Sequence, residues 1–133
     1  MIENIEIFLS FNNLSVTEIF KRISENDSYN YLTFIKEIYN NIQSGQSIYI
    51  LSDKNVKFIK KNKNLNDNDK ENLISFFSTL GKSDLNGQII NCKTYKEIFK
   101  KTLNNLEKNE SFECKSTGTL IIGSGILLII LII

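Results

Sequence analysis

The side chains that most often carry out chemistry in proteins are scarce in this sequence. It contains no histidine, so the commonest general base and the commonest metal ligand are both absent. Cys92 and Cys114 lie 22 positions apart, without the close spacing of a redox or zinc site, and we expect both to be small apolar fillers. The sequence therefore predicts no catalytic residue, no metal site and no cofactor, and a protein that is not an enzyme.

An acidic run, Asp67-Asn68-Asp69-Lys70-Glu71, resembles the start of a calcium-binding loop because oxygen ligands alternate along it. The sixth position of such a loop would be Asn72 instead of glycine, and the twelfth would be Ser78 instead of glutamate. The run is better explained as the first turn of a helix, where negative charge stabilises the helix dipole.

Five lysines follow one another closely between positions 54 and 63: Lys54, Lys57, Lys60, Lys61 and Lys63. Such a run is typical of the solvated face of a helix. It would also suit contact with anionic lipid headgroups or with an acidic partner. The sequence leaves these interpretations open, with the solvated face favoured.

The most specific local pattern runs from Leu80 to Gln88 and reads Leu-Gly-Lys-Ser-Asp-Leu-Asn-Gly-Gln. We expect Gly81 to adopt a positive φ angle that ends one helix, and Ser83 to cap the next. Asp84 would complement the helix dipole, with Gln88 one turn later on the same face. The pattern predicts a tight bend that fixes the angle between two helices and serves either structure or partner binding.

The elements around this bend follow from apolar residues at three- and four-residue steps, with no alternating run that favours a strand. Asn12-Asn13 would end the first helix, and Ser15 to Glu18 form a capping box that opens the second. The expected helices cover residues 2–12, 15–24, 27–44, 47–59, 67–80 and 83–115, with Asp27 or Ser28 capping the third, Gly45 closing it and Ser47 opening the fourth. The fold class is all-α, a small bundle of five to six helices in a domain of residues 1–115.

Residues 116–133 carry no charge, and 11 of them are Leu or Ile. As a helix they would extend about 27 Å, close to the ~30 Å thickness of the hydrocarbon core. We therefore expect a single C-terminal transmembrane anchor. The first residues show no secretory signal, and all lysines precede the anchor, which places the domain in the cytoplasm under the positive-inside rule.

The chain has 16 Lys and Arg against 15 Asp and Glu, so its near-zero net charge selects no nucleic acid. Its aromatic residues lie on the apolar stripes and not between basic residues, which indicates core packing instead of base stacking. We expect no nucleic-acid partner and no small-molecule substrate.

Three of these features together, namely the turn, the long polar helix that follows it and the apolar C-terminal segment, resemble the stage III sporulation protein AB family of endospore-forming bacteria. The family's Leu-Gly-x-Ser-Asp-x-x-x-Gln turn is matched by Leu80, Gly81, Ser83, Asp84 and Gln88, and the Leu/Ile-rich C-terminal anchor is matched as well. Weaker matches are Ser44-Gly45-Gln46-Ser47 and residues 16–23, where Glu18 is kept and Thr17 replaces the family's proline. The family pattern also has a transmembrane helix ahead of this domain, whereas this sequence starts within the domain's first helix.

The resemblance implies a domain similar to the cytoplasmic domains of F-type platform proteins in type II secretion and type IV pilus systems. It implies a membrane platform at the outer forespore membrane, in the mother cell, as part of a secretion-like complex needed for endospore formation. The implied partners are a secretion-type ATPase, the stage III sporulation protein AA, and other stage III sporulation membrane proteins. We expect Glu3, Glu6 and Glu18 to offer that ATPase an acidic docking surface.

A small tail-anchored toxin or membrane-permeabilising protein is the alternative, because such proteins also end in Leu- and Ile-rich tails. Growth arrest on modest expression would favour it. The well-specified helix caps of the domain favour the platform.

Overall fold

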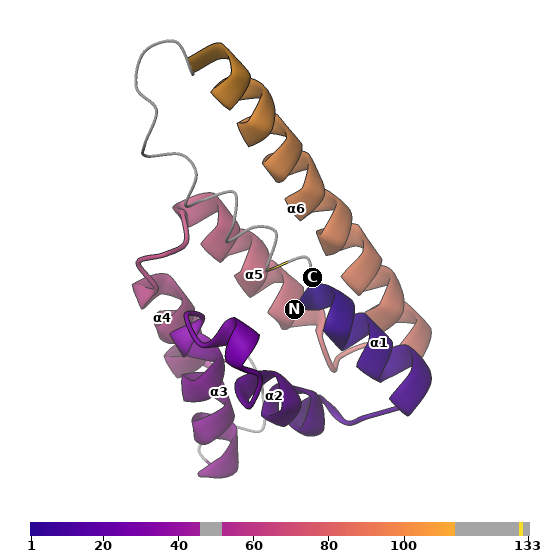
Figure 1. The fold of residues 1–133 in the computed structure, drawn as a ribbon. Helices are drawn as coiled ribbons and strands as arrows, with labels where there is room; N and C mark the ends of the chain where they lie inside the picture. The colour runs from indigo at the N-terminus through magenta and orange to yellow at the C-terminus, as the bar shows by residue number, and fades with distance from the viewer. Residues whose placement is uncertain (46–51, 114–130, 132–133) are drawn as a thin grey trace.

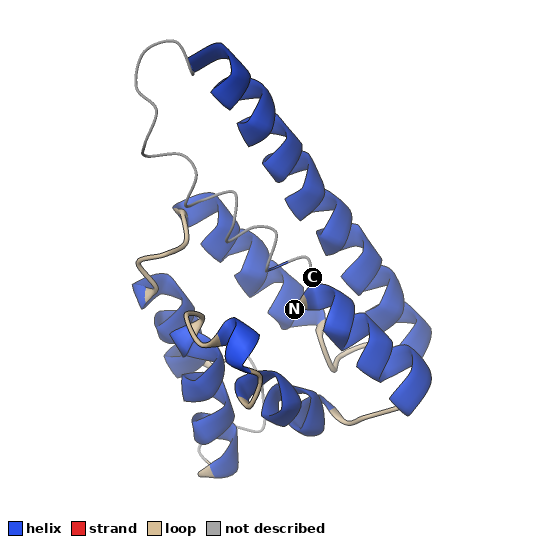
Figure 2. Cartoon of the chain, in the orientation of Figure 1, coloured by secondary structure: helices blue, strands red, loops and turns tan. Residues whose placement is uncertain are grey.

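Six α-helices and one short 3-10 helix make up the computed structural model, which describes residues 1–45, 52–113 and 131 (Figures 1 and 2). The helices are α1 (Ile2–Asn12), α2 (Val16–Ser24), η1 (Asp27–Tyr29), α3 (Thr33–Gln43), α4 (Asp53–Lys61), α5 (Asp67–Thr79) and α6 (Leu85–Glu113). No strand occurs among these described residues. The predicted all-α bundle is confirmed.

Helix α6 is the long axis of the fold, and both α1 and α5 pack against it (Figure 1). Helix α1 runs antiparallel to the first half of α6. Helix α2 packs on α3, α3 on α4, and α4 on α5. The core is rich in phenylalanine. The ring of Phe77 on α5 lies with its centroid 5.5 Å from that of Phe20 on α2 and 6.4 Å from that of Phe34 on α3. These buried aromatic pairs pack α5 against α2 and α3.

The first two helices begin and end as predicted. Asn13 follows α1 in the left-handed conformation at φ 47° and so stops the helix. At α2, the Ser15 hydroxyl accepts the amide of Glu18 at 3.3 Å, while the Glu18 carboxylate accepts the amide of Ser15 at 3.0 Å. The capping box is confirmed.

The predicted start of the third helix is wrong. Asn26 caps the 3-10 helix η1 by accepting the amide of Ser28 at 2.9 Å, and α3 begins only at Thr33. The buried side chain of Tyr29, together with Leu32, holds this segment on the core, so tertiary burial overrides the local capping signal. Gly45 ends the helix at φ 70°, as expected.

The fourth helix also begins later than predicted. Ser52 is its N-cap, with its hydroxyl accepting the amide of Asn55 at 3.3 Å, so the Ser52-Asp53 pair opens α4 instead of interrupting a longer helix. The predicted cap, Ser47, lies outside the described residues.

The acidic residues of α5 do not all face solvent. Asn66 caps the helix by accepting the amide of Asp69 at 2.8 Å. Asp67 is exposed and pairs with Lys70, whereas Asp69 is only 3% exposed and its Oδ1 has no hydrogen-bond partner. Burial raises the pKa of Asp69 above its ordinary value.

The predicted anchor, residues 116–133, lies outside the described residues except for Leu131, which is buried with the core residues. In the described parts of the chain, every helix is too short or too polar to span a bilayer.

Candidate functional site

The bend between α5 and α6 is formed by the residues that the sequence singled out. Gly81 has a φ angle of 82°, which a residue with a side chain adopts only under strain. The amide of Lys82 bonds to the carbonyl of Thr79 at 3.2 Å and closes the end of α5. The predicted positive φ angle of Gly81 is confirmed.

The side chain of Gln88 reaches back from α6 and holds this bend. Its Oε1 accepts the amide of Gly81 at 3.2 Å, and its Nε2 donates to the carbonyl of Ser83 at 3.0 Å. One amide thus satisfies two backbone groups that the bend would otherwise leave unpaired. The Gln88 side chain therefore connects the first turn of α6 to the backbone of the α5–α6 bend.

Asp84, and not Ser83, caps α6. Its Oδ1 accepts the amide of Gly87 at 2.9 Å, and its carbonyl accepts the amide of Gln88 at 3.0 Å. The predicted cap at Ser83 is wrong, because the helix begins one residue later, at Leu85. A charged cap also complements the helix dipole.

Gly87 belongs to the site, although the sequence argument did not select it. A Cβ atom at this position would lie 2.8 Å from Ser83 Oγ and 2.9 Å from both Asp84 Oδ1 and Ser83 Cβ. Only glycine lets the capping carboxylate approach so closely. A glycine in the first turn of a strongly periodic helix was the available signal, because it weakens the helix unless packing requires it.

The bend is also fitted to α2. A Cβ atom on Gly81 would lie 3.4 Å from Val16 Cγ2, so the start of α2 packs directly against the turn. The turn therefore joins α5 to α6 and lies next to the start of α2. Residues Gly81 to Asp84 are nevertheless exposed, so a partner has access to them.

Two of the three predicted docking acids, Glu3 and Glu6, share one lysine on α6. Lys96 Nζ lies 2.9 Å from a carboxylate oxygen of Glu6 and 3.9 Å from one of Glu3. The Glu6 side chain is 16% exposed and that of Glu3 is 46% exposed. The hydrogen bond to Glu6 raises the pKa of Lys96. Glu6 thus joins α1 to α6, while Glu3 remains accessible.

Glu18, the third predicted docking acid, is exposed on α2 and belongs to the capping box. The hydrogen bond from the Ser15 amide lowers the pKa of Glu18 below its ordinary value. Glu3 and Glu6 on α1 therefore share Lys96 on α6, whereas Glu18 belongs to the capping box of α2.

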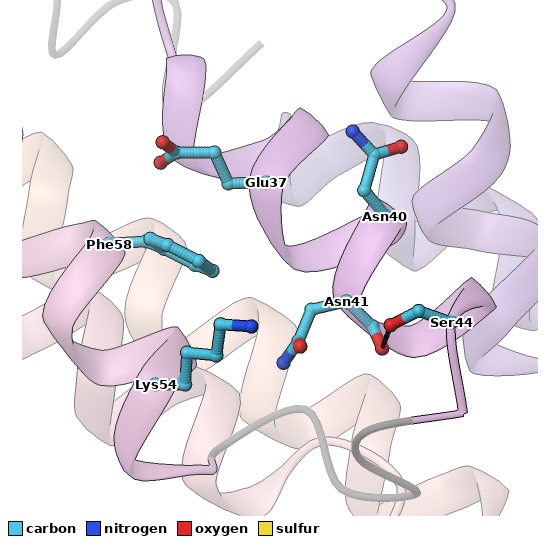
Figure 3. A pocket seen from close by; sticks show the side chains of 6 residues that line it. All are labelled: Glu37, Asn40, Asn41, Ser44, Lys54 and Phe58. Carbon is cyan, nitrogen blue, oxygen red and sulfur yellow. Dashed lines mark hydrogen bonds between the residues drawn. The ribbon is translucent and has the colours of Figure 1, made fainter.

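A groove of about 310 Å³ lies between α3 and α4 (Figure 3). Helix α3 contributes Glu37, Asn40, Asn41 and Ser44, and α4 contributes Lys54 and Phe58. It offers a carboxylate, an ammonium group and amides, without a nucleophile activated by a neighbouring base. We assign it no chemistry.

Cys92, on the inner face of α6, is buried as predicted, and burial raises the pKa of its thiol to about 12. Cys114 lies outside the described residues. Within the described part of the chain, no cluster of three or more His, Cys, Asp or Glu side chains is placed to hold a metal ion.

The family model described as stage III sporulation protein AB matches residues 1–133, the whole chain. The chain belongs to the stage III sporulation protein AB family. Neither a curated protein nor a solved structure matches it significantly. Membership gives the protein a role in stage III of sporulation, and the family is not known for an enzymatic activity. The turn at Leu80–Gln88, which suggested the family, is held by the side-chain hydrogen bonds of Asp84 and Gln88.

Proposed function

We propose that this stage III sporulation protein AB family member is a non-enzymatic membrane platform. It would work in the stage III secretion-like complex at the outer forespore membrane, with its domain in the mother-cell cytoplasm. Its partners would be the secretion-type ATPase, stage III sporulation protein AA, and other stage III sporulation membrane proteins. The observation that carries this proposal is the turn between α5 and α6, which the Gln88 side chain holds through its hydrogen bonds to Gly81 and Ser83.

A platform must pass force without bending at its joints. Gln88 binds both sides of the α5–α6 turn, and Lys96 ties α1 to α6 through Glu6. At about 1.5 Å per residue, the 29 residues of α6 extend roughly 43 Å. A helix braced in this way is suited to transmit a push from one end of the domain to the other.

The bilayer contact in this proposal is made by residues 116–133. Their 11 Leu and Ile residues favour insertion by roughly 3 to 7 kcal/mol on the insertion scale. In the structure Leu131 is buried with the core residues, so its apolar side chain avoids water there too. Insertion would give it lipid contacts instead.

The proposal includes an acidic docking surface for the ATPase, and the exposure of its three acids decides which of them to test. Glu6 is largely covered by its ion pair, so Glu3 and Glu18 are the acids most open to a partner. Exchange of these two for Gln should weaken ATPase binding. Unchanged binding would remove the acids from the docking surface.

The experiment that tests the function is binding between the full chain, reconstituted in lipid nanodiscs, and the purified ATPase. A second experiment measures sporulation. The Gln88→Ala variant loses the two hydrogen bonds that hold the α5–α6 turn and should impair sporulation even if it still binds the ATPase, because force transmission needs a rigid turn. A Gln43→Ala variant, on the exposed end of α3, is the matched control. Absence of ATPase binding by the wild-type chain would contradict the platform role.

A further inference from the structure

The sequence contains a single Asn-Gly pair, Asn86-Gly87, and it lies in the first turn of α6. In such a pair the asparagine side chain can react with the backbone nitrogen of the following residue. Glycine favours this reaction, because it has no side chain to hinder the approach and it leaves the backbone free to turn. Asn86 is exposed, so water reaches it. It is the asparagine of this chain with the strongest chemical tendency to deamidate.

The capping of α6 requires the glycine that makes Asn86 reactive. A Cβ atom on Gly87 would lie 2.8 Å from Ser83 Oγ and 2.9 Å from Asp84 Oδ1. A residue with a side chain would therefore displace the capping carboxylate. The reactive pair is thus a consequence of how the α5–α6 turn is built.

The folded turn restrains the nitrogen that would react. The Gly87 amide donates its hydrogen to Asp84 Oδ1 at 2.9 Å, and the nitrogen must lose that hydrogen before it can attack. The capping carboxylate also opposes the negative charge that the nitrogen would then carry. In an α-helical backbone, with ψ at about −42°, the nitrogen is turned away from the Cγ atom of Asn86. The closed turn therefore protects Asn86.

Gln88 restrains the same peptide from its other side. Its side chain accepts the amide of Gly81 at 3.2 Å and donates to the carbonyl of Ser83 at 3.0 Å. The residue after Gly87 is thereby tied to the bend. The Asn86–Gly87 peptide can rotate into the reactive geometry only when the first turn of α6 opens locally.

We propose that Asn86 is a deamidation site and that the Asp84 cap sets its rate by keeping the first turn of α6 closed. In the open turn, the Gly87 nitrogen gives up its proton to water and bonds to Asn86 Cγ. The bond from Cγ to the side-chain nitrogen breaks, and that nitrogen takes up a proton and leaves as ammonia. Water then opens the resulting ring at either carbonyl carbon. The products are aspartate and isoaspartate, and the reaction consumes water and needs no partner.

The two products have different effects on the turn. Aspartate adds negative charge to the first turn of α6, where the helix dipole favours it. Isoaspartate places an extra carbon atom in the main chain, so Gln88 no longer lies one helical turn beyond Asp84. The bonds from Gln88 to Gly81 and Ser83 would then be lost. Isoaspartate formation at position 86 therefore loosens the α5–α6 turn irreversibly.

The test follows deamidation of the full chain in lipid nanodiscs at mildly alkaline pH, with peptide mass spectrometry to measure aspartate and isoaspartate at position 86 over time. Wild type is compared with Asp84→Ala and Gln88→Ala. We expect Asp84→Ala to react about 5- to 30-fold faster, because loss of an N-cap raises the population of the open turn by that factor. Gln88→Ala should also react faster than wild type. In denaturant all three chains should react at one common, fast rate.

Two controls are available in the same chain. Asn104 is also exposed on α6 but is followed by Asn105, whose side chain hinders the reaction, so position 104 should stay unmodified in every sample. The Gln43→Ala variant, at the end of α3, should deamidate at position 86 at the wild-type rate. Thermal melts of each variant show whether the domain is folded during the incubation.

Each outcome decides the proposal. Equal rates in folded and denatured wild type would show that the turn does not protect Asn86 and would overturn it. Absence of both products at position 86 in denaturant would remove the site altogether. A folded Asp84→Ala chain that reacts at the wild-type rate would show that the cap does not set the rate. If Asp84→Ala does not fold, Gln88→Ala decides, and an unchanged rate in that variant overturns the proposal.

Discussion

Gly87 is the residue whose replacement tests the construction of the turn most directly. Alanine favours a helix over glycine by about 1 kcal/mol, so Gly87→Ala in an ordinary helix would stabilise. Here the new Cβ would meet Ser83 Cβ at 2.9 Å and displace the capping carboxylate of Asp84. We expect a net loss of about 1 to 2 kcal/mol, measured by chemical denaturation.

The control for this substitution is Gly45→Ala, at a position with φ 70° and no atom within 4 Å of the added Cβ. It introduces backbone strain of about 1 kcal/mol without any clash. A stabilised Gly87→Ala protein would show that Asp84 does not cap α6 as described.

Asp69 is a second residue with a measurable signature, because its carboxylate is buried without a partner for Oδ1. Its pKa is raised by burial, so the protonated form favours the folded state, and that advantage is lost as pH rises through the folded pKa. Asp69→Asn removes the charge and should stabilise by up to about 1 kcal/mol at pH 7.

The gain from Asp69→Asn should disappear below the ordinary aspartate pKa of 3.8, where both states carry a neutral side chain. Thermal melts at pH 7 and pH 3 measure it. The exposed neighbour Asp67, exchanged for Asn, should lose a few tenths of a kcal/mol through the helix dipole. An equal response of the two variants would contradict the burial of Asp69.

At the scale of elements, α3 and α4 are joined by a pair of buried amides. Asn41 Nδ2 donates to Asn55 Oδ1 at 2.7 Å, and both side chains are at most 5% exposed. Asn55→Leu leaves the Asn41 amide without this acceptor and should lower the free energy of unfolding by about 1 to 3 kcal/mol. The double variant with Asn41→Leu should lose less than the sum of the single losses.

The exposed neighbour Asn40, changed to Leu, is the control and should alter stability by less than about 0.5 kcal/mol. Strict additivity of the two single substitutions would show that the amide pair does not couple the helices. The pair would then have no role in fixing their register.

The elements that the sequence predicted correctly are those decided by local contacts. The capping box at Ser15, the end of α3 at Gly45 and the bend at Gly81 depend on residues a few positions apart. The start of α3 was missed because burial of Tyr29 and Leu32 decides it. Asp69 lies in the first turn of a helix as predicted, but no local signal showed its burial. The contact of Glu6 with a lysine 90 positions away likewise had no local signal.

At the scale of the whole molecule, the direction of α6 and the proposed anchor together predict how the domain stands on a membrane. Lys82 precedes the start of α6, and Lys108 lies near its end. The helix between them extends roughly 35 Å. If the domain is upright, a dye at Lys108 lies near the lipid headgroups and one at Lys82 lies far from them.

Energy transfer from single labels to headgroup acceptors in nanodiscs measures this arrangement. The full chain would carry Cys114→Ser with either Lys108→Cys or Lys82→Cys, and the buried Cys92, whose thiol pKa burial raises to about 12, should not compete for the dye. We expect efficient transfer from position 108 and weak transfer from position 82. Equal, efficient transfer would mean that α6 lies along the bilayer surface instead of standing upright on it. No transfer from either position would refute the anchor itself, and force could then reach the membrane only through another subunit.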